Sequence, residues 1–199
     1  MGQRLGEGNW QKKLSRALTV FLPIVIILFS TAPLIYNLNF YESLFIKNHV
    51  DVKEGRDSTL KLFDYFKSAD SKLKINSFNK EEKTHLEEVR VLWQALTFIF
   101  ITALFLWIIF LNEAKNKRSI FLKGGILTII LLLLSAAIPF DYLFEAFHKI
   151  FFIQPWKFAP NSVLIMTYPQ GFFYGFASAI WLNSFLLAVL MVVLSSIRD

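Results

Sequence analysis

The sequence predicts an all-α integral membrane protein with four transmembrane helices and an extracytoplasmic, largely helical cap. Hydrophobic residues make up 55% of the 199 residues, and the mean hydropathy is +0.48; this is more apolar surface than one small soluble core can bury. Four stretches are long and apolar enough to cross the hydrocarbon layer as helices, namely residues 18–36, 91–111, 120–138 and 172–194. We expect residues 1–199 to form a single membrane domain, with the cap built from loops 37–90 and 139–171.

The first apolar stretch is expected to stay in the protein as a membrane span rather than to be a cleaved signal peptide. It is longer than a typical signal core, and it contains Pro23 and Pro33. A small-x-small cleavage site does not follow it before the polar region begins.

Basic residues beside the spans predict the topology. Four basic residues and one acidic residue precede the first span, and the same balance holds between the second span and the first turn of the third. The positive-inside rule places both segments in the cytoplasm, so both termini are cytoplasmic and both cap loops are extracytoplasmic. The residues counted are Arg4, Lys12, Lys13, Arg16 and Glu7 in the first segment, and Lys115, Lys117, Arg118, Lys123 and Glu113 in the second.

Helix signals in the first cap loop bring a histidine close to the membrane. Apolar spacing predicts a short amphipathic helix over residues 57–68. Residues 79–82, Asn-Lys-Glu-Glu, resemble a capping box, so the second membrane helix is expected to begin there, outside the bilayer. His85 then lies about two turns before the hydrocarbon, with Glu88 on the same face and able to orient its imidazole. Taken alone, this turn is more typical of a solvated, charged helix start than of a functional histidine.

The third loop holds a second histidine in an aromatic run. Pro139 at the first helical position and an acid soon after it predict a helix start. Asp141, Glu145, His148 and Phe152 then follow one face at steps of four, three and four. Most of the aromatic residues in this loop are compatible with an interfacial belt that holds the protein at headgroup depth. His49 lies in a polar loop and is expected to be a surface residue.

Several kinds of chemistry are excluded by residues that the sequence lacks. It has no cysteine, nucleophile elbow, zinc-binding H-E-x-x-H helix or phosphate-cradling glycine loop. The formal charge of +6 lies at membrane edges, which argues against a nucleic-acid partner. Two histidines make a poor metal site, because three or four ligands are usual. What remains is general acid and base catalysis by imidazoles, without metal or cofactor, on a lipid-linked substrate at the membrane face.

Three segments resemble the bacterial lipoprotein intramolecular transacylase family. They are His85-Leu86-Glu87-Glu88-Val89-Arg90, then Phe147-His148-Lys149-Ile150-Phe151-Phe152 with Trp156, and Leu164-Ile165-Met166-Thr167-Tyr168-Pro169-Gln170-Gly171-Phe172-Phe173. The resemblance implies four spans under a cap in the bacterial plasma membrane, with His85 and His148 catalytic on the extracytoplasmic side. This chain departs from the family pattern at Glu88, where Asp is usual, and at residues 159–163, which lack the usual carboxylates.

The resemblance also implies a reaction. The sn-2 acyl chain of a diacylglyceryl-cysteine lipoprotein would move to the amino group of that cysteine, giving the lyso-form. We expect His148 to act as base, with Asp141 or Glu145 favouring its charged form, and His85 to transfer a proton or stabilise the oxyanion, although the two roles could be exchanged. Candidate donors near the oxyanion or substrate are Arg90, Lys149, Trp156 and Tyr168, and the expected acyl-chain pocket is Trp93, Phe151 and Phe152.

Two other functions are compatible with the same residues. A non-catalytic membrane protein could bind a lipid or a protein partner through its cap, with both histidines as packing groups. An enzyme could also act on the acyl chains of free lipids. For the transacylase function the expected partners are diacylated bacterial lipoproteins and membrane lipids, and the expected state is a monomer.

Overall fold

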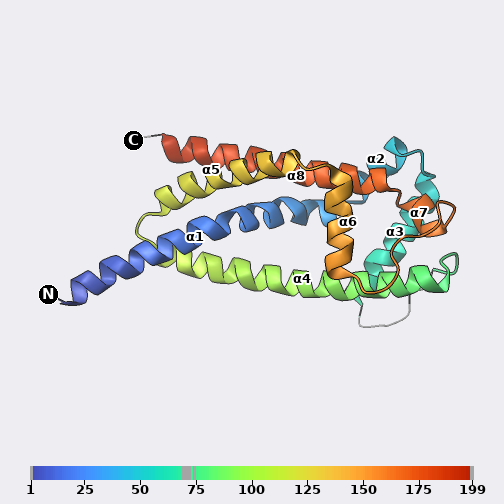
Figure 1. Ribbon diagram of the computed structural model, residues 1–199, viewed down its shortest axis with the longest axis horizontal. Helices are drawn as coiled ribbons and strands as arrows, with labels where there is room; N and C mark the ends of the chain where they lie inside the picture. Colours follow the sequence, from blue (N-terminus) through green and yellow to red (C-terminus); the bar gives the residue numbers. More distant parts are fainter. Residues whose placement is uncertain (1, 69–72, 74, 198–199) are drawn as a thin grey trace. The chain divides into compact units, whose positions relative to one another are not determined.

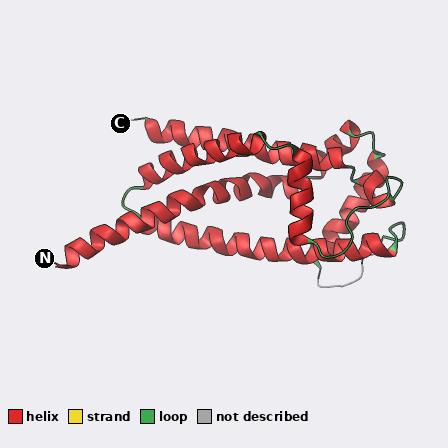
Figure 2. Ribbon diagram, viewed as in Figure 1, coloured by secondary structure: helices red, strands yellow, loops and turns green. Residues whose placement is uncertain are grey.

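The computed structural model describes residues 2–68, 73 and 75–197, with side chains from residue 9 onward. In this part of the chain every regular element is helical, which confirms the all-α fold class (Figures 1 and 2). The side chains of Arg4 and Glu7, counted above for the topology, lie outside the described residues. The helices are α1 (Gly2–Ile35), α2 (Leu38–Lys47), α3 (Val52–Lys67), α4 (Lys80–Glu113), α5 (Lys117–Ala136), α6 (Phe140–Phe151), α7 (Val163–Thr167) and α8 (Gln170–Ser196).

Four of these helices are long and apolar enough to cross a membrane, as the sequence predicts. They are α4, α5, α8 and the Asn9–Ile35 part of α1. The first and third predicted spans end slightly too late, because α1 ends at Ile35 and α5 at Ala136. Pro139 explains the second difference, since the residue before a proline is driven out of the helical region.

The first of two compact units comprises residues 1–32, 99–137 and 180–199. Its core contains Leu22, Ile26 and Ala188, none of which is more than 1% exposed. Gly124 of α5 lets α1 approach closely, because a Cβ at that position would lie 2.6 Å from Cδ2 of Leu22. Trp181 of α8 donates its indole N–H to the carbonyl of Leu132 at 3.0 Å. Helix packing of this kind is typical of a membrane bundle.

The second compact unit comprises residues 33–98 and 138–179 and holds both histidines of interest. Its core is aromatic and is centred on Phe45, which is fully buried and packs on Tyr168 and Phe172. α3 begins at Val52, five residues before the predicted start, because Asp51 caps it by accepting a hydrogen bond from the backbone N–H of Glu54 at 2.9 Å. The first turn of α3 has no large apolar face, so hydrophobic spacing does not reveal where the helix starts.

The predicted capping box at the start of α4 is confirmed. The Glu82 carboxylate accepts from the Asn79 N–H at 2.7 Å, and the Asn79 side chain accepts from the Glu82 N–H at 2.9 Å. Glu82 is also buried, and its other oxygen accepts from the Leu164 N–H in the first turn of α7 at 2.9 Å. One carboxylate therefore begins the helix that carries His85 and fixes α7 beside it.

Candidate active site

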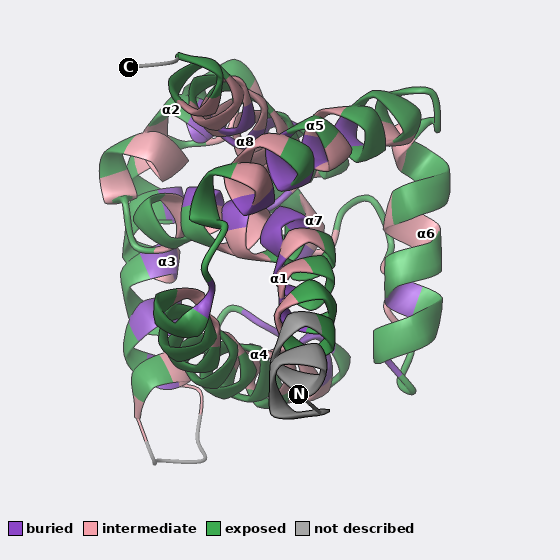
Figure 3. Cartoon of the chain, turned by 90° about the vertical axis from the view of Figure 1, so that its left-hand side faces the viewer, coloured by how far each residue is buried: buried purple, intermediate pink, exposed green. Residues whose placement is uncertain are grey.

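His85 of α4 and His148 of α6 meet inside the second unit. Their ring centroids are 6.1 Å apart and their planes differ by only 19°. His85 is 7% exposed and His148 is 9% exposed. His148 is the one residue of α6 that is buried, and Figure 3 shows most of this helix in the colour of exposed residues. Two imidazoles stacked at this distance and this depth can act on the same small group of atoms.

The tautomer of His148 is set by its own helix. Its Nδ1 lies 2.7 Å from the carbonyl oxygen of Phe144, one turn earlier. Because a carbonyl only accepts hydrogen bonds, Nδ1 donates, and Nε2 carries the free lone pair of the neutral ring. Burial lowers the pKa of His148 below its ordinary value, and the Phe144 hydrogen bond opposes that shift in part. His148 is thus kept as a neutral base with one defined basic nitrogen.

His85 carries the opposite feature, a ring nitrogen without a protein partner. Its Nδ1 is buried and makes no hydrogen bond to any residue that the structure describes. The ring packs against Phe152, at a centroid distance of 4.7 Å, and Phe158, at 5.6 Å. A buried polar atom without a partner costs free energy and is uncommon in native proteins, which makes it a candidate for binding a substrate group.

Aromatic side chains surround the His85–His148 pair. α6 ends at Phe151, and Phe152 adopts an extended backbone with its N–H on the His148 carbonyl. The Phe152 ring consequently contacts both imidazoles, at 4.7 Å from His85 and 5.3 Å from His148. Trp156 then packs on His148 at 4.5 Å with its plane tilted by 33°. These rings keep water from the imidazoles and leave few polar groups to compete for a substrate.

Glu88 has a different partner from the one predicted. Its carboxylate accepts from the backbone N–H groups of Ile153 and Gln154, at 3.3 Å, rather than from the His85 imidazole. Helical spacing places Glu88 beside His85 on α4, but it does not include the loop after α6 that offers two N–H groups. Glu88 thus holds the segment that carries Phe152 and Trp156 over the histidines.

The predicted support of His148 by carboxylates on its own helix is not what the structure shows. Asp141 accepts a hydrogen bond from the side chain of Gln170 at 2.7 Å. Glu145 pairs with Lys149 and Lys157, each at 3.1 Å, and hydrogen bonds from these lysines, Lys157 first, lower the pKa of Glu145. The physical reason is competition: exposed carboxylates reach mobile lysines and amides, whereas the His148 ring turns inward to the Phe144 carbonyl.

The remaining predicted residues divide into those at the pair and those elsewhere in the unit. Trp156 and Phe152 lie at the pair, whereas Phe151 is 45% exposed and packs on Phe147. Trp93 donates to the Tyr36 hydroxyl at 3.2 Å, and Arg90 donates to the Ser68 carbonyl and lies over the ring of Tyr65. The predicted acyl-chain pocket is therefore not formed, because Trp93, Phe151 and Phe152 do not line one common surface.

Tyr168 is a core residue of this unit. Its hydroxyl lies 2.8 Å from the Thr59 hydroxyl, and burial raises the pKa of the phenol. Lys149 is occupied by the ion pair with Glu145. Neither residue has a described contact with the imidazoles, so their role as donors is given no geometric support.

Three residues of this site are missed by sequence reasoning. Phe144 supplies both the carbonyl that fixes His148 and a ring 4.2 Å from it; its position four residues before His148 was the available clue. Glu82 was evident only as a helix cap. Phe158 reaches His85 because the chain reverses after α6, and periodicity cannot predict such a loop path.

The fold and the buried histidine pair define a class of protein, a multi-pass helical membrane protein with an imidazole site under an aromatic cover. The family model of the lipoprotein intramolecular transacylase Lit matches residues 16–173. The chain therefore belongs to the lipoprotein intramolecular transacylase family, and membership makes it an acyltransferase. A comparison with curated protein sequences finds no match.

Solved structures share the fold. The membrane integral lipoprotein intramolecular transacylase Lit from Bacillus cereus is similar with a TM-score of 0.77 and 22% sequence identity, over 94% of each chain. Two further structures of that protein carry a mutation of one histidine, to arginine or to alanine. Each has a TM-score of 0.71 and 22% identity, covering 98% and 97% of this chain respectively and 95% of the other.

Proposed function

We propose that this protein moves the sn-2 acyl chain of a diacylglyceryl-cysteine lipoprotein to the amino group of the same cysteine, giving the lyso-form. The observation that carries the proposal is the stacked histidine pair, in which one ring has a defined basic nitrogen and the other a buried nitrogen without a partner. Membership of the family supports the lipoprotein substrate.

The transfer balances without any further reactant. The cysteine nitrogen attacks the carbonyl carbon of the sn-2 ester, a C–N bond forms, the C–O bond to glycerol breaks, and one proton passes from nitrogen to the glyceryl oxygen. The transition state closes an eight-membered ring through nitrogen, Cα, Cβ, sulfur, two glyceryl carbons, the ester oxygen and the acyl carbon. Because an ester becomes an amide, the reaction needs no external energy source or cofactor.

His148 is suited to the base role. The α-amino group, with an ordinary pKa of about 7.7 to 8.0, must lose a proton as it attacks. Nε2 of His148 takes this proton, and the resulting imidazolium is stabilised by the Phe144 carbonyl on Nδ1–H. The same proton is then returned to the departing glyceryl oxygen.

His85 is suited to stabilise the charge that develops on the acyl oxygen. With Nδ1 protonated, the ring donates to the oxyanion from a position that is already desolvated, where a hydrogen bond is stronger than in water. A second proton nearby is disfavoured, because two imidazolium rings at this separation would repel each other. His85 thus stays neutral while His148 exchanges the proton.

The aromatic cover accounts for transfer rather than hydrolysis. Phe152, Phe158 and Trp156 enclose the imidazoles, so the acyl carbon meets the tethered amine and not bulk water. Holding the flexible lipid headgroup in the ring-closing geometry removes part of the entropic barrier. In well-oriented reactions this effect lowers the activation free energy by up to about 7–11 kcal/mol.

The membrane supplies the substrate along α6. Several exposed side chains of this helix and its end are large and apolar, including Phe147, Ile150 and Ile153 at 41%, 73% and 93% exposure. A short helix with such a face lies in the interfacial plane, where acyl chains reach it. The charge distribution supports cytoplasmic termini and an extracytoplasmic site.

One experiment separates this function from the two alternatives. The purified protein and its His85→Ala/His148→Ala double variant are incubated with diacylated lipoprotein and phospholipid together, and fragmentation mass spectrometry locates each acyl chain. The proposal predicts N-acylated lipoprotein with the wild type and none with the variant. Conversion of phospholipid alone would support a free-lipid enzyme, and no conversion by the folded wild type would support a binding protein.

A further inference from the structure

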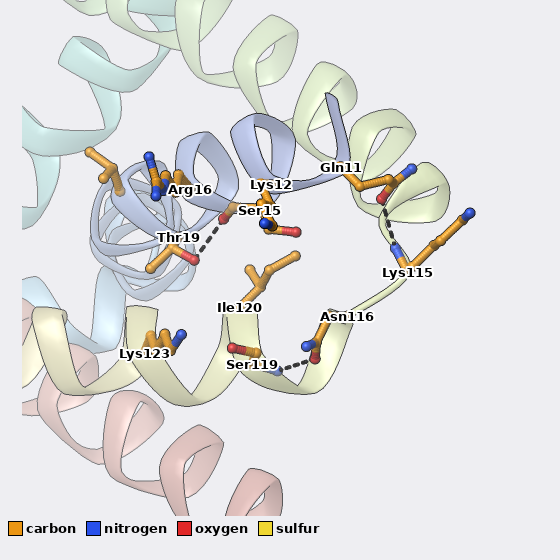
Figure 4. A pocket seen from close by; sticks show the side chains of 11 residues that line it. Gln11, Lys12, Ser15, Arg16, Thr19, Lys115, Asn116, Ser119, Ile120 and Lys123 are labelled. Atoms are coloured by element: carbon orange, nitrogen blue, oxygen red, sulfur yellow. Dashed lines mark hydrogen bonds between the residues drawn. The ribbon is translucent and has the colours of Figure 1, made fainter. Parts of the chain in front are cut away.

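A cavity of about 510 Å³ lies in the first compact unit, which does not contain the histidine pair. Its walls come from the face of α1 around residues 11–20, from Lys115 and Asn116 after α4, and from the first turns of α5 (Figure 4). The topology predicted above places these segments at the cytoplasmic edge of the membrane.

The charge around this cavity has a single sign. Of the described residues that line it, four are cationic and none is acidic. The cations come from three segments of the chain, so they converge through folding and not through proximity in the sequence. They are Lys12 and Arg16 of α1, Lys115 after α4, and Lys123 of α5. The positive-inside rule explains why basic residues lie at this edge, but it does not explain why these four surround one cavity.

Hydrogen-bond donors and an exposed apolar side chain complete the site. Ser15 and Ser119 line it, as does Asn116, which caps α5 by accepting from the Ser119 N–H at 3.1 Å. The side-chain NH₂ of Asn116 and the positive end of the α5 dipole both favour an anion. Val20, which is 61% exposed, adds apolar surface, and the fully buried Ile120 packs behind the lining. The cavity thus combines four cations with an accessible apolar side chain.

We propose that this cavity binds the phosphate headgroup of an anionic phospholipid, which holds α1 against α5 at the membrane edge. A phosphate diester matches four cations and several hydroxyl and amide donors. Free phosphate has the same charge chemistry, but it would leave the exposed apolar surface of Val20 uncovered. The glycerol and first methylenes of a lipid cover that surface.

Calorimetric titration of the full-length protein in nonionic detergent tests this site. The probes are dioctanoyl phosphatidylglycerol, dioctanoyl phosphatidylcholine and inorganic phosphate. Two double variants remove cavity charges from different segments, namely Lys12→Gln/Arg16→Gln and Lys115→Gln/Lys123→Gln. The matched control, Lys13→Gln/Lys117→Gln, removes two exposed charges on the same segments that do not line the cavity.

The wild type is expected to bind phosphatidylglycerol saturably and to bind phosphatidylcholine at least tenfold more weakly. Each cavity variant should raise the Kd for phosphatidylglycerol about 30-fold, at roughly fivefold per basic residue near an anionic lipid, and the control should change it less than twofold. If one cavity variant fails to fold, the other decides. Equal weakening by the control, equal binding of phosphatidylcholine, or phosphate binding as tight as the lipid would overturn the proposal.

Discussion

Replacing Glu82 by alanine should strongly destabilise the unit that carries the histidines. The carboxylate is 1% exposed and accepts two backbone N–H groups, from Asn79 at 2.7 Å and from Leu164 at 2.9 Å. The buried Leu164 N–H left without a partner costs about 1–3 kcal/mol, and loss of the part-buried hydrogen bond from Asn79 adds about 0.5–1.5 kcal/mol, so Glu82→Ala should lower the free energy of unfolding by about 1.5–4.5 kcal/mol. The start of α4 and its contact with α7 would loosen together, three residues from His85.

The measurement is the free energy of unfolding in a mixed-micelle denaturant titration, followed by helical circular dichroism. Glu81→Ala is the matched control, because Glu81 is the exposed neighbour in the same helical turn. It should change the free energy by less than about 0.5 kcal/mol. Equal effects of the two substitutions would refute the role given to the buried carboxylate.

Three further predictions concern the site and the bundle. Burial lowers the pKa of His148, so the neutral base persists as the pH falls, and the acid limb of kcat/KM should lie below pH 6.5, the ordinary pKa of histidine. Trp156→Ala removes part of that burial and should move the acid limb to higher pH. An acid limb that Trp156→Ala leaves in place in a pH-rate profile would contradict this. Glu88→Ala frees the loop after α6 and should lower kcat about tenfold without moving the acid limb downward, whereas a downward shift would support the predicted role of Glu88 as the partner of the His85 imidazole. Gly124→Val places side-chain atoms against Leu22, and thermal unfolding should show a loss of about 1–3 kcal/mol, with an unchanged stability speaking against close packing there.

The sequence predicts the helical framework well because the physical signals for it are local. Four apolar stretches of membrane length, and a reciprocal cap at Asn79 and Glu82, need no knowledge of distant contacts. The helix after Pro139 was also predicted, although Pro139 is its N-cap rather than its first residue. Where a start depends on a single side chain, as with Asp51 before α3, the boundary was placed too late.

The candidate site could be predicted only in part, because its partners come from different segments. His85 and His148 were singled out by position and do meet, but that they are catalytic stays a prediction. Helical spacing suggested carboxylate partners for both rings, and competition from lysines and loop N–H groups gave those carboxylates other partners. The backbone carbonyl that fixes His148 is present at every residue, so sequence cannot mark it.

The rate of N-acyl formation by single-histidine variants tests the central claim most directly. Wild type, His85→Ala, His148→Ala and the exposed control His49→Ala are incubated with purified diacylated lipoprotein, and N-terminal fragment ions are followed over time. The account predicts that either site variant loses a factor of about 10²–10⁴ in rate, while the control keeps the wild-type rate. Wild-type N-acyl formation by His85→Ala or by His148→Ala would contradict it.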